Sequence, residues 1–232
     1  MTRDNDLPSA PNSTAAFNAA HARAYAEGPP RQVPGFAGLL RMTSMFLAER
    51  ISAHGRVLVL GAGGGLELKA LADDHPGWTF DGVDPSADML QVAKQIVAPH
   101  AARIHLHEGY IDTAPQGPFD GATCLLTLHF VSRDQRLETL RQIHRRLVPR
   151  APFVVAHISF PQTEPERSIW IARHVTFSGT DPAHVERAKQ AIATKLSILS
   201  PEEDEALLRE AGFSNVSLFY AGLSFRGWVG YA

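Results

Sequence analysis

A short apolar run that ends in a cluster of glycines occupies residues 56–66, Arg56-Val-Leu-Val-Leu-Gly61-Ala-Gly-Gly-Gly65-Leu66. A run of this length bounded by glycine is typical of a strand buried on both faces, as in a parallel sheet. The glycines indicate a tight strand-to-helix turn, whose backbone can approach a ligand closely. We therefore expect the ligand site of this protein at the end of this strand.

The alternation of strand and helix continues along the chain. Helical patterns follow over 66–75, after Pro85 and over 132–147, with short apolar strand patterns between them. Such alternation predicts βαβ units with right-handed crossovers in a mostly parallel sheet. The last two strands are joined near Gly222 by too short a link to be parallel, so they are expected to form an antiparallel hairpin. The expected strands cover 56–60, 78–84, 103–107, 119–126, 153–158, 213–220 and 223–229.

The predicted fold class is therefore α/β, with a Rossmann-like, doubly wound sheet. We expect residues 1–55 to form a tail and capping helices ahead of a ligand-binding domain at 56–232. Residues 161–199 interrupt the alternation with a helical insertion. Because this insertion follows the carboxyl end of a strand, we expect it to lie over the ligand edge as a lid. Capping boxes are predicted at the helix starts marked by Ser132 and Ser200.

Composition narrows the class of protein. The 232 residues are 44% hydrophobic and 20% charged, which is typical of a globular chain with a substantial core. Lys and Arg number 22 against 24 Asp and Glu, and the formal charge of −2 makes nucleic acid an unexpected partner. Cys124 is the single cysteine, so no disulfide framework or multi-cysteine metal site is expected. No apolar run approaches a membrane span, and we predict a cytoplasmic protein with no membrane partner.

Three classes of ligand use a glycine-rich turn of this kind. A phosphate-binding loop would require Gly-Lys-Ser/Thr, whereas Leu66-Glu67 follows the glycines here. A dinucleotide fingerprint requires a third glycine where Leu66 stands. Glycines at 61, 63 and 65 have the spacing expected of a turn that binds S-adenosylmethionine (SAM). The turn therefore favours SAM as the cofactor, with NAD as an alternative.

Asp84 is the next candidate binding residue. It ends the second expected strand, 23 positions after Gly61. A carboxylate at this place can accept hydrogen bonds from both ribose hydroxyls of a nucleoside. The alternative is that Asp84 caps the helix that begins near Pro85. Because the glycine turn, the spacing and the strand end agree, we expect the ligand role.

These features resemble the class I SAM-dependent methyltransferases over nearly all of the chain from about Val33. Their first motif is similar to residues 61–65, and their second to Asp84-Pro-Ser-Ala-Asp-Met-Leu90. Their third and fourth motifs resemble 108–111 and 119–126. The resemblance implies a seven-stranded sheet with one antiparallel strand and an adenine held between Met89 and Ile111. The residues expected to bind the cofactor are Phe36, Gly61, Ala62, Gly63, Gly65, Asp84, Pro85, Met89, Gly109, Tyr110, Ile111 and Leu125.

A narrower resemblance is to the carboxy-S-adenosylmethionine synthases, which act in tRNA wobble-uridine modification and transfer a carboxyl-bearing unit onto SAM. It is carried by Val33-Pro-Gly-Phe36, by Leu126-Thr-Leu-His-Phe130 and by residues 219–225. This resemblance also suggests a homodimer.

The sequence departs from these families at several polar positions. Phe36 stands for a tyrosine of the synthases, Leu125 for an asparagine, and approximately Lys189 for an arginine. Val59 and Tyr110 replace acids usual in the superfamily. The loss of several polar groups favours an ordinary methyltransferase over the carboxylated cofactor.

Two histidines are candidate general bases. His129 lies just past the fourth expected strand and His157 near the end of the fifth, at the ligand edge, and imidazole titrates near neutral pH. For each, the alternative is a structural histidine bonded within the fold. The cofactor supplies the reactive carbon, so a base is optional, and no metal is expected.

Methyl transfer from SAM to a small-molecule acceptor under the lid is the leading functional hypothesis. Carboxyl transfer to SAM is the first alternative. A catalytically silent SAM-binding protein is the second, and it is favoured by the missing acids at Val59 and Tyr110.

Overall fold

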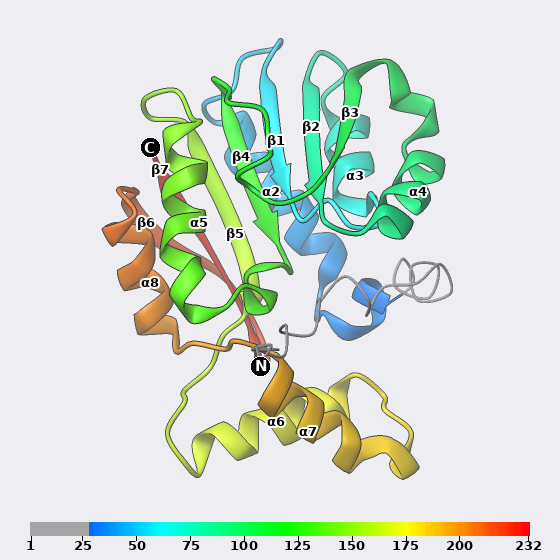
Figure 1. Cartoon of the computed structure of the whole chain (residues 1–232), viewed down its shortest axis with the longest axis vertical. Helices are drawn as coiled ribbons and strands as arrows, with labels where there is room; N and C mark the ends of the chain where they lie inside the picture. Colours follow the sequence, from blue (N-terminus) through cyan, green and yellow to red (C-terminus); the bar gives the residue numbers. More distant parts are fainter. Residues whose placement is uncertain (1–27) are drawn as a thin grey trace, which may run out of the picture.

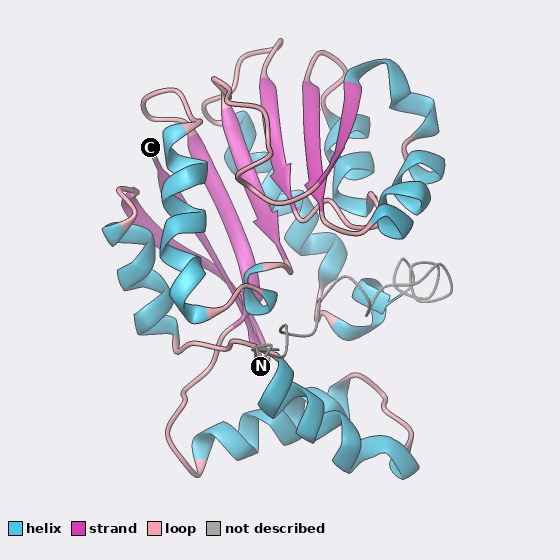
Figure 2. Ribbon diagram, viewed as in Figure 1, coloured by secondary structure: helices cyan, strands magenta, loops and turns pink. Residues whose placement is uncertain are grey.

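The computed structural model describes residues 28–232, which form one seven-stranded sheet with helices on both faces (Figures 1 and 2). The strand order is β3-β2-β1-β4-β5-β7-β6. Strands β1 to β5 are parallel, and β7 pairs antiparallel with both β5 and β6. The predicted α/β fold with its terminal antiparallel hairpin is confirmed. The strands are β1 (Arg56–Leu60), β2 (Thr79–Asp84), β3 (Ile104–Glu108), β4 (Gly121–Leu125), β5 (Pro152–Ile158), β6 (Ser214–Gly222) and β7 (Phe225–Tyr231).

Helices cover the two faces of the sheet with separate hydrophobic cores. Alternate residues of β1 point to opposite faces, because side chains along a strand alternate. Val57 and Val59 belong to the core beneath α2 and α3, whereas Leu58 and Leu60 belong to the core beneath α5 and α8. The helices are α2 (Phe36–Ala48), α3 (Leu66–Asp74), α4 (Ala87–Ile96), α5 (Arg133–Arg145), α6 (Glu166–Phe177), α7 (Val185–Lys195) and α8 (Pro201–Glu210), with short 3₁₀ turns η2 (Ala98–Arg103), η3 (Leu128–Phe130) and η4 (Pro182–His184).

The two predicted capping boxes differ in outcome. At α8, the Ser200 hydroxyl accepts from the backbone N–H of Glu203, and the Glu203 carboxylate accepts from the Ser200 N–H, so this box is confirmed. At α5, the Ser132 hydroxyl donates to Oε1 of Gln135 at 3.1 Å and caps no backbone group. The second prediction is therefore wrong, because the two side chains bond to each other instead of to the helix start.

Helices α6 and α7 pack on each other beyond the carboxyl ends of the parallel strands (Figure 1). The segment that carries them leaves the sheet after β5 and returns beside it, since Ser159 and Leu199 form a parallel bridge. These helices therefore lie beyond the sheet edge at which the ligand site is expected, and their role as a lid stays a prediction. The division of the chain at residue 55 stays a prediction, and residues 1–27 lie outside the described part. None of the helices described is long and apolar enough to cross a membrane.

Candidate active site

The glycine turn connects β1 to α3 in a conformation that favours glycine. Gly61, Gly63 and Gly65 have φ angles of 78°, 49° and 83°. At Gly61 a Cβ atom would lie 1.9 Å from Oγ1 of Thr127, whose hydroxyl is held by a hydrogen bond to the Leu125 carbonyl. A side chain at this position would therefore both strain the backbone and displace the end of β4.

Asp84 braces this turn from the end of β2. Its Oδ2 accepts from the backbone N–H of Gly63 at 2.9 Å, and its Oδ1 accepts from the N–H of Ser86 at 2.9 Å. Burial raises the pKa of the Asp84 carboxyl, and these two hydrogen bonds oppose the rise. The alternative role as helix cap is wrong, because Ser86 is the N-cap of α4 and its hydroxyl accepts from Met89.

The predicted adenine site follows at the ends of β2 and β3. The Gly109 N–H donates to the Asp84 carbonyl at 3.0 Å, which ties the turn after β3 to the same edge. Met89 and Ile111 are buried, whereas Tyr110 is 54% exposed. Pro85 is half-buried and precedes the cap of α4, not its first turn. Binding roles for these residues stay predictions.

A small, half-open pocket lies where β1 and β4 end, beside the glycine turn. Five of the predicted cofactor residues line it: Phe36, Gly61, Ala62, Gly63 and Leu125. Gly65 of the same turn and the predicted residues on the β2 and β3 side do not line it, although Asp84 reaches the turn through its hydrogen bond to Gly63. The remaining lining residues are Pro29, Leu40, Gly64, Leu66, Glu67 and Leu126.

Glu67 is the lining residue that sequence reasoning missed as a site residue. It lies in the first turn of α3 and is only 8% exposed. Burial raises the pKa of its carboxyl to about 7, although the neighbouring Thr123 hydroxyl on β4 lowers it in part. Oε1 of Glu67 and Oγ1 of Thr123 are buried neighbours, but neither makes a hydrogen bond of normal geometry. The sequence did contain a feature that could have identified Glu67: it is a single acid between two leucines, directly after the glycines.

His129 is held in η3 by the fold itself. Its ring is 5% exposed, and Nδ1 accepts a 3.4 Å hydrogen bond from the Ile158 N–H. Burial holds the pKa of the ring well below its ordinary value of 6.5, so the ring is neutral and its hydrogen is on Nε2. Nδ1, the nitrogen that could act as a base, is therefore already hydrogen-bonded to the backbone. His129 thus has the structural role that was the alternative to catalysis.

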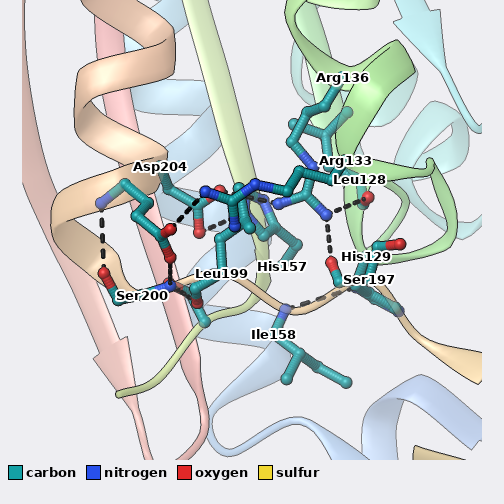
Figure 3. Close-up of polar contacts among 12 residues, drawn as sticks. Leu128, His129, Arg133, Arg136, His157, Ile158, Ser197, Leu199, Ser200 and Asp204 are labelled. Carbon is teal, nitrogen blue, oxygen red and sulfur yellow. Dashed lines mark hydrogen bonds and ion pairs between the residues drawn. The ribbon is translucent and has the colours of Figure 1, made fainter. Parts of the chain in front are cut away.

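His157 is directed into a buried charged cluster with Asp204 and Arg136 (Figure 3). Nε2 of His157 lies 3.1 Å from Oδ2 of Asp204, and the His157 side chain is 1% exposed. Its expected position facing an acceptor is therefore corrected: the ring points toward α8, where Asp204 supplies a carboxylate. The position of His157 near the end of the strand was predicted, and the ring has the structural role that was its alternative.

Arg136 is the centre of that cluster. Its guanidinium donates to Oδ1 of Asp204 at 2.9 Å, to the Leu128 carbonyl at 2.8 Å and to the Ser197 carbonyl (Figure 3). Burial alone would raise the pKa of Asp204, but His157 and Arg136 together bring it below its usual value. The cluster therefore fastens α8, the turn after β4 and the segment leaving α7 to one another.

Comparisons with known proteins agree with this arrangement. A family model described as a methyltransferase domain matches residues 57–150. An O-methyltransferase family protein from Burkholderia thailandensis superposes with a TM-score of 0.69 at 14% identity, over 93% of this chain and 60% of that one. Phosphoethanolamine N-methyltransferase 2 of Haemonchus contortus, solved with SAM, superposes with a TM-score of 0.67 at 14% identity. The match covers 93% of this chain and 57% of that one. The chain spans about three fifths of the length of these solved proteins.

The chain thus has the fold of the class I SAM-dependent methyltransferases, and it is similar to them in its methyltransferase-domain match and glycine turn. The chain is also similar to carboxy-S-adenosyl-L-methionine synthases. The enzyme of Pseudomonas putida is 26% identical over 225 residues, which cover 92% of this chain and 91% of the relative. The enzyme of Trichodesmium erythraeum is 27% identical over 213 residues, which cover 87% of this chain and 82% of the relative.

Proposed function

We propose that the protein binds SAM at the ends of β1, β2 and β4 and transfers its methyl group to a small-molecule acceptor. One observation carries this proposal: the glycine turn, braced by Asp84, forms one wall of a largely apolar pocket at the ends of β1 and β4. The residues fit the cofactor, since the glycine turn lines the pocket with bare backbone and Phe36 and Leu125 offer apolar walls. Asp84 retains carboxylate lone pairs for ribose hydroxyls.

Bound SAM supplies an electrophilic methyl carbon on a sulfonium, so the protein chiefly positions the acceptor and excludes water. The turn and Asp84 would fix the nucleoside, and the buried edge of β4 would fix the other end of the cofactor. Neither His129 nor His157 is arranged to take a proton from an acceptor. We infer that the acceptor loses its proton to water or reacts without a protein base.

A small acceptor is supported by charge and by position. The formal net charge of −2 offers no general attraction for a nucleic-acid backbone. The α6–α7 segment extends past the strand ends where the acceptor would enter (Figure 1). A cytoplasmic homodimer is part of the proposal and is checked by cell fractionation and by light scattering of the purified protein.

Carboxyl transfer to SAM is the second candidate, because the curated relatives named above are carboxy-S-adenosyl-L-methionine synthases. A carboxylated cofactor needs a basic or polar partner for its extra carboxylate. Phe36 and Leu125 offer none, and Lys189 is bound to Glu186 at 2.8 Å. These residues support methyl transfer as the first choice.

Calorimetry with SAM and with NAD tests the cofactor, and tight NAD binding without SAM binding would refute the proposal. Mass spectrometry of the ligand that copurifies separates the two candidate reactions, since a carboxylated adduct would select the second. Methyl transfer is then assayed as S-adenosylhomocysteine formation across small-molecule acceptors. Binding without turnover, together with a closed structure that has no acceptor cavity, would instead indicate a silent SAM-binding protein.

A further inference from the structure

The Glu67 carboxyl is a buried acid whose Oε1 makes no hydrogen bond of normal geometry within the protein, and Glu67 lines the pocket at the glycine turn. A buried polar atom without a partner is costly, and a buried charge more so. A ligand group that bonds this oxygen would remove the cost. The feature therefore calls for a ligand group of complementary charge.

The position of Glu67 relative to Asp84 gives the direction of that ligand. The strand order β2-β1-β4 places Asp84 on one side of the β1 tip. Glu67 interacts with Thr123 of β4 on the opposite side. A ligand that crosses the tip of β1 with its ribose at Asp84 would bring its far end to Glu67. For SAM, that far end is the amino-acid moiety.

The charge of the pocket selects one group of that moiety. Glu67 is the one charged residue among the described residues that line the pocket, and the others are apolar or glycine. An ammonium would meet a carboxylate of opposite sign in a site screened from water, whereas a carboxylate would meet repulsion.

We propose that the Glu67 carboxylate is the counter-ion for the α-ammonium group of the bound cofactor. This inference rests on the proposed function, since it assigns one end of the same ligand. It makes Glu67 a binding residue that orients the amino-acid end and with it the sulfonium to which the methyl is attached.

The test compares Glu67→Gln with a matched control, Glu202→Gln. Both residues are the second residue of their helices, but Glu202 is exposed on α8. Calorimetry at about pH 8, where a carboxyl of ordinary pKa and Glu67 are both ionised, uses three ligands. These are S-adenosylhomocysteine, its decarboxylated analogue, which keeps the amine, and its deaminated analogue, which keeps the carboxylate.

Glu67→Gln is expected to weaken the two amine-bearing ligands by about ten- to a hundredfold, as for loss of a charged hydrogen bond. The deaminated analogue is expected to bind the variant as well as, or better than, the parent protein. Glu202→Gln is expected to change none of the three. Equal weakening of all three ligands, or unchanged binding of S-adenosylhomocysteine, would overturn the inference while leaving the proposed function intact. If the parent protein binds no S-adenosylhomocysteine, the proposed function fails, and this inference fails with it.

Discussion

Replacing Glu67 by glutamine should stabilise the protein in a way that depends on pH. The carboxyl has an ordinary pKa of 4.5, and burial raises it to about 7 in the folded chain. Between these values the folded protein holds a proton that the unfolded chain has released, so its stability falls as the pH rises. One pKa unit corresponds to about 1.4 kcal/mol, so the cost of ionising Glu67 reaches about 3 kcal/mol above pH 7. Below pH 4.5 both states are protonated and the cost vanishes.

Glutamine imitates the protonated carboxyl, so the variant avoids that cost. We expect Glu67→Gln and the parent to differ little at about pH 4.5, and the variant to be about 3 kcal/mol more stable at about pH 8. Urea denaturation of both proteins across this range measures the difference. Glu202→Gln is the control, and its stability relative to the parent should not follow this course. A Glu67→Gln difference that stays constant with pH would refute the reasoning.

Three further predictions concern other buried groups. Arg136→Met leaves the Asp204 carboxylate without its guanidinium and should cost about 3 to 5 kcal/mol in urea denaturation; a loss below about 1 kcal/mol would contradict the buried ion pair. Gly61→Ala puts a methyl group on Thr127, distorts the turn and should lower S-adenosylhomocysteine affinity about tenfold or more by calorimetry; near-parental affinity would contradict a role of the turn's conformation in binding. His129→Gln removes a buried ring whose pKa lies well below 6.5. Because the unfolded chain takes up a proton at this histidine before the folded protein does, the parent protein loses stability as the pH falls below 6.5. That variant should lose less stability than the parent between about pH 6.5 and pH 5, and parallel denaturation curves would contradict the burial of a neutral ring.

The fold followed from local patterns that tertiary contacts did not overrule. The run 56–60 is apolar at every position after Arg56, and it forms the predicted central strand because both faces are covered. The hairpin could be predicted because a link near Gly222 is too short for a crossover. Strand ends moved by one or two residues, as at β4, where Phe119 pairs outside the strand with Leu147.

The site was predictable only where the backbone determines it. The glycine turn and Asp84 lie together because β1 and β2 are neighbours that end at one edge. His157 could not be placed, because its partner Asp204 comes from a helix 47 residues further on. Glu67 was missed for a similar reason: an acid in the first turn of a helix is usually solvated, and only the packing of α3 against β4 buries it.

The place of β7 between β5 and β6 has a consequence for biosynthesis. All seven residues of β5 are buried, and one of its edges is covered by β7 alone. A nascent chain therefore carries an apolar, unpaired strand edge until residues 225–231 leave the ribosome. Unpaired edges of this kind are templates for association with other chains. A chain cut shortly before Phe225 should accumulate as aggregates, even though every residue of the glycine turn has already been made.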